Sequence, residues 1–478
     1  MATSAEASLS GVQGPLARVV AGIRTLYGDR GDQSIARRMA AVALLIRVAS
    51  AGLIFLTQIF LARWMGPFQF GVYLSVWAWM LLIGNLVPLG LSVSAQKFVP
   101  EYTHRKAFDR LRGFLSGSRW IVFAVATFVA LCGAAAVRSL APHIAPEKII
   151  PLYVACAALP FFALSSMLEG IAQSYNWMNL AYVPSYIVGP FLLAVLVAIA
   201  HFAGWPTDAT LAITAAAIAT SAAALIQLRI LDRRLGGVIE PGPKIYEIGT
   251  WLKTSVPIFA GRGFFAVLIA ADLLVLQLFR PPQDIAVYYA AAKIIGVAGL
   301  VYFSVAASSA HRYAEYQVAG DNARLAEFVA GSVRLTFWST FIVVAGVLAL
   351  GKPFLSLFGR DFVAAYPVMF VLAIGILARA SIGPAERLLN MLGQQRACAL
   401  VYAGAVAVFL AVAVVVIPPF GIVGAAAAMS AALIVESCSL YFIAKRRLGL
   451  HIFVWRPNVN ARDPGPPRDS QPGVDQPR

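Results

Sequence analysis

Long apolar stretches separated by short polar connectors run through almost the whole chain. A helix needs about 20 mainly apolar residues to cross the hydrocarbon core of a bilayer. By that rule there are about twelve such stretches, centred near residues 51, 79, 125, 159, 192, 218, 266, 297, 341, 376, 407 and 431. The pattern predicts an all-α polytopic membrane protein with about twelve transmembrane helices.

The first half of the chain resembles the second. A shift of about 215 residues places Arg47 on Arg262 and Pro67 on Pro282 without a gap. The longest connector between spans, residues 230–249, falls between the two copies. We therefore predict two six-helix bundles, residues 39–229 and 250–444. Because each copy has an even number of spans, both copies share one orientation, and the internal repeat is parallel, about an axis along the membrane normal.

Lysine and arginine are distributed unevenly among the connectors. They gather after even-numbered spans, as in Arg105-Lys106 and Arg233-Arg234, and are sparse after odd-numbered ones. The positive-inside rule then places both termini in the cytoplasm. We expect a basic cytoplasmic segment over residues 1–38 and a proline-rich, disordered cytoplasmic tail over residues 445–478.

Composition supports a membrane protein and excludes other classes. Of the 478 residues, 60% are hydrophobic and only 13% are charged, too few charges for the surface of a soluble domain. The net charge of +16 follows the membrane topology, so no nucleic-acid partner is expected. The four cysteines lack metal-site spacing, and no phosphate-binding loop or hydrolase motif is present. The sequence predicts a protein that is not an enzyme and holds no cofactor or metal.

Several cations lie inside the predicted spans. Arg47 and Arg262 occupy equivalent positions of the repeat, and Lys293 and Arg379 lie in later spans. Charges at such depth usually face a protein interior or a water-filled cavity. The planar guanidinium of the three arginines also suits pyrophosphate, and all four cations are predicted to bind an anionic substrate. Two alternatives stay open: arginines that reach the membrane surface, and a structural pair of Lys293 with Asp272.

Four acidic residues also lie within or at the ends of spans. They are Asp272, Glu169, Glu386 and Glu436. Each could bind a coupling proton or sodium ion, and the alternative is a role at a helix end or between helices.

Motifs along most of the chain resemble one transporter family. Residues 61–102 read LARWMGPFQFGVYLSVWAWMLLIGNLVPLGLSVSAQKFVPEY, residues 286–294 read AVYYAAAKI, and LFGRDFVAAYPVM and PPFGIVGAAAAMS follow. In this order they resemble the polysaccharide (O-antigen and exopolysaccharide, Wzx-type) flippases. That family belongs to the multidrug/oligosaccharidyl-lipid/polysaccharide exporter superfamily. The resemblance covers roughly residues 35–445.

The resemblance implies a V-shaped pair of bundles in the bacterial inner membrane. The protein would flip undecaprenyl-pyrophosphate-linked oligosaccharide repeat units by alternating access, for lipopolysaccharide or exopolysaccharide synthesis. Arg47, Arg262, Lys293 and Arg379 would represent the cationic central cavity. Membrane lipids, and a polysaccharide polymerase and chain-length regulator, are the implied partners. The count predicts no spans 13 and 14, which some relatives have. Two other functions stay open: a multidrug or metabolite extruder of the same superfamily, and a non-transporting scaffold of a polysaccharide assembly complex.

Overall fold

The computed structural model describes residues 32–455, apart from the side chains of some helix residues, among them positions 47 and 262. All regular structure in this part of the chain is helical. The helices of the first half are α2 (Asp32–Leu86), α3 (Leu91–His104), α4 (Phe108–Leu140), η1 (Ala141–His143), α5 (Pro146–Ser174), α6 (Met178–Val183), η2 (Pro184–Val188), α7 (Gly189–Phe202) and α8 (Ala209–Gly236). Those of the second are α9 (Ile248–Phe279), α10 (Pro282–Gly296), α11 (Gly299–Val318), α12 (Asn322–Ala349), α13 (Gly351–Phe358), η3 (Arg360–Ala365), α14 (Tyr366–Ala380), α15 (Ala385–Met391) and α16 (Gln395–Leu448).

The two longest helices are each broken at a glycine. Helix α2 has 55 residues and α16 has 54, whereas about 20 residues suffice to cross a bilayer. Gly66 in α2 has a φ of 73°, and Gly421 in α16 has a φ of 56°. Glycine adopts positive φ without the steric penalty of a Cβ, and neighbouring prolines remove helical hydrogen bonds. The chain turns back at each glycine, so each long helix consists of two segments.

The described residues contain eight helices that are long and apolar enough to span a membrane. A ninth is the pair α10 and α11, which is bent by 42° at its break. This count treats residues 49–104 and 395–448 as one span each and classes Gly263–Phe279 with the shorter apolar helices. The all-α, multi-pass architecture is confirmed. The number of twelve spans and the cytoplasmic location of the termini stay predictions.

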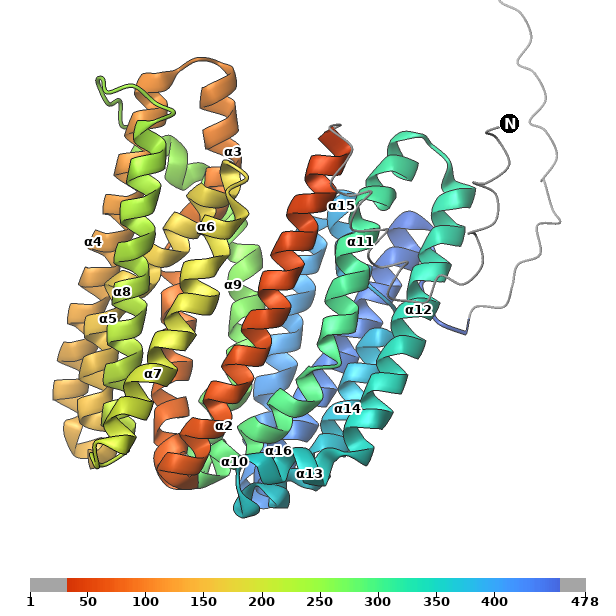
Figure 1. The fold of residues 1–478 in the computed structure, drawn as a ribbon. Helices are drawn as coiled ribbons and strands as arrows, with labels where there is room; N and C mark the ends of the chain where they lie inside the picture. Colours follow the sequence, from red (N-terminus) through yellow and green to blue (C-terminus); the bar gives the residue numbers. More distant parts are fainter. Residues whose placement is uncertain (1–31, 456–478) are drawn as a thin grey trace, which may run out of the picture.

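The helices form two groups. In Figure 1, α3–α8 lie on the left and α10–α16 on the right, and the groups meet at the lower end and diverge toward the upper end. Helices α2 and α9 run between the two groups. The start of α2, the α8–α9 connection and the end of α16 lie at the same, upper end (Figure 1).

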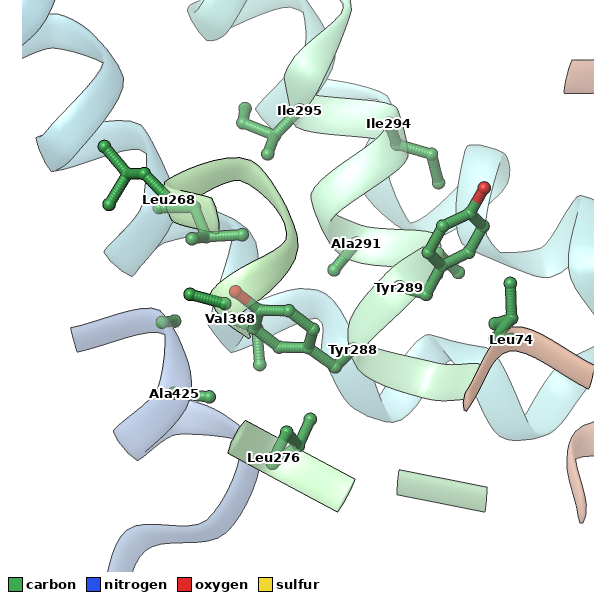
Figure 2. Packing of buried hydrophobic residues seen from close by; sticks show 14 of the residues in the cluster. Leu74, Leu268, Leu276, Tyr288, Tyr289, Ala291, Ile294, Ile295, Val368 and Ala425 are labelled. Carbon is green, nitrogen blue, oxygen red and sulfur yellow. The ribbon is translucent and has the colours of Figure 1, made fainter. Parts of the chain in front are cut away.

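The buried side chains explain why the groups meet at one end only. One hydrophobic cluster joins the lower half of the first group to the second group. In Figure 2, Leu74 of α2, Leu276 of α9, Tyr288 of α10, Val368 of α14 and Ala425 of α16 converge in this cluster. A second cluster fills the upper half of the first group alone, together with Trp251 at the start of α9. The upper half of the first group therefore has its own core.

The ends of the predicted segments differ from the observed ones. Helix α16 continues to Leu448, beyond the expected bundle end at residue 444. After it, Ile452 and Val454 are buried, and the Val454 amide donates to the Ser381 carbonyl at 3.0 Å. Residues 445–455 thus pack against the second group, because their apolar side chains belong to its hydrophobic cluster. The predicted basic segment before residue 32 and the tail beyond 455 lie outside the described residues.

The connection between the two halves is also held in place. It runs over residues 237–247, inside the predicted 230–249. Arg112 of α4 donates to the carbonyl oxygens of Glu240 and Pro243, both at 2.9 Å. The Ile245 amide donates to the Asp109 carbonyl at 3.0 Å. These contacts fix the connection to the start of α4.

Candidate functional site: charges within the helices

Asp272 of α9 is held by a tyrosine of the neighbouring helix. The Tyr288 hydroxyl donates to its Oδ2 at 3.1 Å, and the Leu273 amide donates to its Oδ1 at 2.8 Å. No ion pair within 4.0 Å joins Asp272 to Lys293 among the described side chains. Asp272 is thus held by a carboxylate–phenol contact and lies beyond salt-bridge distance from Lys293, with which it still interacts electrostatically. A structural pairing of the two residues stays a prediction.

Lys293 lies on the outward face of an otherwise buried helix. Its neighbours Ile294 and Ile295 are buried, whereas Lys293, Val297 and Leu300 are exposed, at the spacing of one helix face. The Lys293 ammonium is 5.2 Å from the centre of the Tyr289 ring. It stands one turn before the break between α10 and α11. The ring's electron density stabilises a cation placed over it without forming an ion pair.

Arg379 is enclosed by two carboxylates and two aromatic rings. Its Nη2 lies 3.3 Å from Glu436 Oε1 and 3.8 Å from Glu386 Oε2. Its Cζ lies 4.9 Å from the centre of the Tyr302 ring and 6.0 Å from that of Phe265. The Arg379 side chain is 22% exposed, and that of Glu436 is fully buried. Five elements, α9, α11, α14, α15 and α16, thus supply this cluster, which we call the Arg379 cluster.

The Arg379 cluster joins residues to which the sequence had assigned different roles. Arg379 was predicted to bind substrate, and Glu386 and Glu436 were predicted to bind a coupling ion. Two carboxylates around one guanidinium leave one negative charge when both are ionised. Arg379 Nε and both Glu436 oxygens make no hydrogen bond within the described residues. The cluster can accept a proton or a small cation without any further cationic side chain.

Glu169 lies apart from this cluster, in the first group. On α5 it accepts a hydrogen bond from Gln173 Nε2 at 2.9 Å, and Gln173 Oε1 accepts one from Gln96 Nε2 at 2.7 Å. This relay connects α5 to α3. The geometry matches the interhelical role that the sequence left open as the alternative to ion binding.

The side chains of Arg47 and Arg262 lie outside the described residues. The helices that carry them, α2 and α9, pack against each other and run between the two groups (Figure 1). Their predicted role in binding substrate stays a prediction.

Two glycine contacts between the halves were missed by the sequence reasoning. A Cβ on Gly71 of α2 would lie 1.7 Å from the carbonyl oxygen of Pro282, at the start of α10. A Cβ on Gly90 would lie 2.6 Å from the carbonyl oxygen of Ser255 in α9. Beside it, Ser94 Oγ and Ser255 Oγ are 2.6 Å apart. Small residues carry no charge or motif, so only their frequency at contacts between membrane helices could have indicated these positions.

Comparison with known proteins adds a family and a fold. The family described as "Polysaccharide biosynthesis protein" matches residues 36–310, more than half of the chain. Comparison with curated proteins gives no match.

Solved structures of transporters share the fold. An inward-facing multidrug resistance MATE family transporter of the MOP superfamily has a TM-score of 0.70 at 13% identity, over 85% of this chain and 98% of that one. Lipid II flippase MurJ in an inward closed conformation has a TM-score of 0.67 at 14% identity, over 85% and 87%. A MOP superfamily transporter from Pyrococcus furiosus has a TM-score of 0.64 at 13% identity, over 90% and 98%. At these identities the likeness concerns the fold alone.

Proposed function

Because this chain belongs to the polysaccharide biosynthesis protein family and has the fold of MOP-superfamily transporters, we propose that it flips a lipid-linked oligosaccharide across the bacterial inner membrane. The substrate is an undecaprenyl-pyrophosphate-linked repeat unit of a cell-surface polysaccharide. One observation carries the proposal beyond the family: a membrane helix at the junction of the two halves carries an exposed lysine, Lys293, that forms no ion pair within 4.0 Å among the described side chains.

A lysine at this position points to an anionic substrate. A charged side chain in lipid is costly, so the exposed face of α10 and α11 borders water or substrate between the two groups rather than acyl chains. The predicted cations Arg47 and Arg262 lie on α2 and α9, which also run between the groups. Together the three cations hold the pyrophosphate, and the polyprenyl tail stays in the bilayer.

The Arg379 cluster fits the role of coupling element. Its three charged groups lie on α14, α15 and α16, and its net negative charge changes when Glu436 or Glu386 takes up a proton or a cation. Arg379 then serves to hold the two carboxylates rather than the substrate. Binding of the ion alters the charge at the ends of α14 and α15, where the chain is broken by Gly383 at a φ of 59°.

Charge at residue 293 is the test of the proposal. We expect Lys293→Gln to abolish export of the glycan and Lys293→Arg to retain most of it. The matched control is Lys352→Gln, since the Lys352 ammonium lies 5.3 Å from the centre of the Tyr366 ring. This control removes the same kind of cation–π contact outside α10. Equal export by Lys293→Gln and wild type, at equal amounts in the membrane, would overturn the assignment.

The paired arginines give a second test that separates transport from scaffolding. Arg47→Ala and Arg262→Ala are each expected to stop export while the protein remains inserted. A scaffold tolerates both substitutions. An exporter of cationic drugs favours carboxylates in its binding site. Its activity would therefore not need the positive charges of Arg47 and Arg262.

A further inference from the structure

A small pocket lies at the lower end of the molecule, opposite the α8–α9 connection and on the side predicted to face the periplasm. Its volume is about 270 Å³. It is lined by Ser75 and Trp79 of α2, His143 of η1, Lys148 of α5, and Gln277 and Leu278 of α9. The pocket therefore lies between the first group and α9. A volume just below the usual range for ligand pockets has room for one sugar ring, not for a whole repeat unit.

Two polar groups of this pocket, on Lys148 and Gln277, are donors without a hydrogen-bond partner among the described residues. The Lys148 side chain is half-buried and makes no hydrogen bond or ion pair with another described side chain. Gln277 Nε2 is buried and has no hydrogen-bond partner among the described residues. A buried donor without a partner is destabilising, so such groups usually mark a place where a ligand or water accepts a hydrogen bond. His143 adds a further nitrogen at the rim.

An indole completes the pocket. Trp79 is 41% exposed although the residues around it on α2 are mostly buried. An exposed indole offers a flat apolar surface on which the C–H face of a pyranose can lie. A cation, a free amide donor and an aromatic face together suit a sugar ring that carries a carboxylate.

We infer that this pocket binds an acidic sugar, a pyranose of the hexuronate class, at the exit side of the membrane. The inference rests on the proposed function, since the glycan reaches this end only if it is translocated. The Lys148 ammonium pairs with the carboxylate, the Gln277 amide donates to a ring hydroxyl, and the Trp79 indole covers the apolar face. The site receives the leading sugar as the outer ends of the two groups separate.

The direct test is binding of small sugars to the purified full-length protein in detergent. Methyl β-D-glucuronide and methyl β-D-glucoside are titrated separately and followed by saturation-transfer NMR. The pocket predicts saturable binding of the glucuronide, at least tenfold tighter than that of the uncharged glucoside. Absence of saturable binding, or equal affinity for the two sugars, would overturn the inference, and neither result needs a variant that folds.

Variants then locate the site. Lys148→Gln should weaken glucuronide binding at least tenfold and leave glucoside binding unchanged. Trp79→Leu should weaken both, whereas Trp120→Leu, which removes a 70% exposed indole of α4, should weaken neither. Unchanged binding in Lys148→Gln would contradict the inference, and so would equally tight binding of glycerol phosphate, which would assign the pocket to a lipid headgroup. The binding assay involves no transport. A failure of this inference, seen as absent sugar binding, is therefore distinct from a failure of the proposed function, seen as normal export by Lys293→Gln.

Discussion

Removing Arg379 should destabilise the protein more than removing Arg379 and Glu436 together. Arg379 Nη2 and Glu436 Oε1 are 3.3 Å apart, and the Glu436 side chain is fully buried. At an effective dielectric constant of about 20, their attraction at this distance is about 5 kcal/mol. Loss of one member of such a pair leaves an uncompensated buried charge, at a cost of about 3–5 kcal/mol. In Arg379→Gln, Glu386 adds a second carboxylate to that unpaired charge.

The double variant Arg379→Gln/Glu436→Gln removes both charges while it keeps the shape of the cluster. Of Arg379, Glu386 and Glu436, only Glu386 then remains, and its side chain is 24% exposed. We expect the double variant to recover at least half of the stability lost by Arg379→Gln alone. Glu436→Gln should cost less than Arg379→Gln, because Arg379 keeps one carboxylate at 3.8 Å.

The assay is the apparent unfolding temperature in one detergent for the wild type, the two single variants and the double variant. Arg105 and Glu101 supply a matched control pair, whose atoms are 3.2 Å apart but whose side chains are 66% and 31% exposed. Exposed pairs of this kind are worth about 0.2–1 kcal/mol, so their single and double variants should shift the unfolding temperature little. If the losses at Arg379 and Glu436 simply add, the burial argument fails.

Three further predictions concern the contacts between the halves. Gly71→Ala should lower the apparent unfolding temperature, because its Cβ would clash with the carbonyl oxygen of Pro282, the first residue of α10, and overpacking costs about 1–3 kcal/mol. Gly52→Ala in the same helix is the control, since a Cβ there has nothing within 4 Å and should not lower the temperature. Equal shifts in the two variants would refute the contact. In a background free of the native cysteines, Ser94→Cys/Ser255→Cys should cross-link on mild oxidation, since the two Oγ atoms are 2.6 Å apart, and no cross-link on reducing and non-reducing gels would contradict this packing. Trp251→Phe should lower the free energy of unfolding by about 1 kcal/mol, because it removes the 3.2 Å hydrogen bond from the indole to the buried Tyr102 hydroxyl. An unchanged unfolding temperature in the same thermal assay would contradict this.

Hydropathy predicted the helical architecture well, because the bilayer imposes length and apolarity on every span. The sequence around Gly66-Pro67 and Gly421 also explains why the chain turns there, because glycine tolerates a positive φ and proline removes a helical hydrogen bond. These features depend on residues close together in the chain.

The contacts of the candidate site could not be predicted in the same way. Arg379 and Glu436 lie on different helices, and their meeting depends on how α14 rotates against α16. The sequence indicates Lys293 as a partner of Asp272, whereas the side chain that donates a hydrogen bond to Asp272 is Tyr288. A phenol carries no charge at neutral pH, so a search for opposite charges overlooks it. The predicted tail also begins too early. Its prolines start only at Pro457, whereas Ile452 and Val454 before them are apolar and buried.

The most direct measurement of the central claim is the sidedness of undecaprenyl-pyrophosphate-linked glycans in cells depleted of this protein. Spheroplasts can be probed with a glycan-cleaving enzyme or lectin that reaches only the periplasmic leaflet. We expect intact repeat units to accumulate facing the cytoplasm in depleted cells and to become accessible again when the wild-type protein, but not Lys293→Gln, is restored. Repeat units that reach the periplasmic leaflet at the normal rate without the protein would show that it is not their flippase.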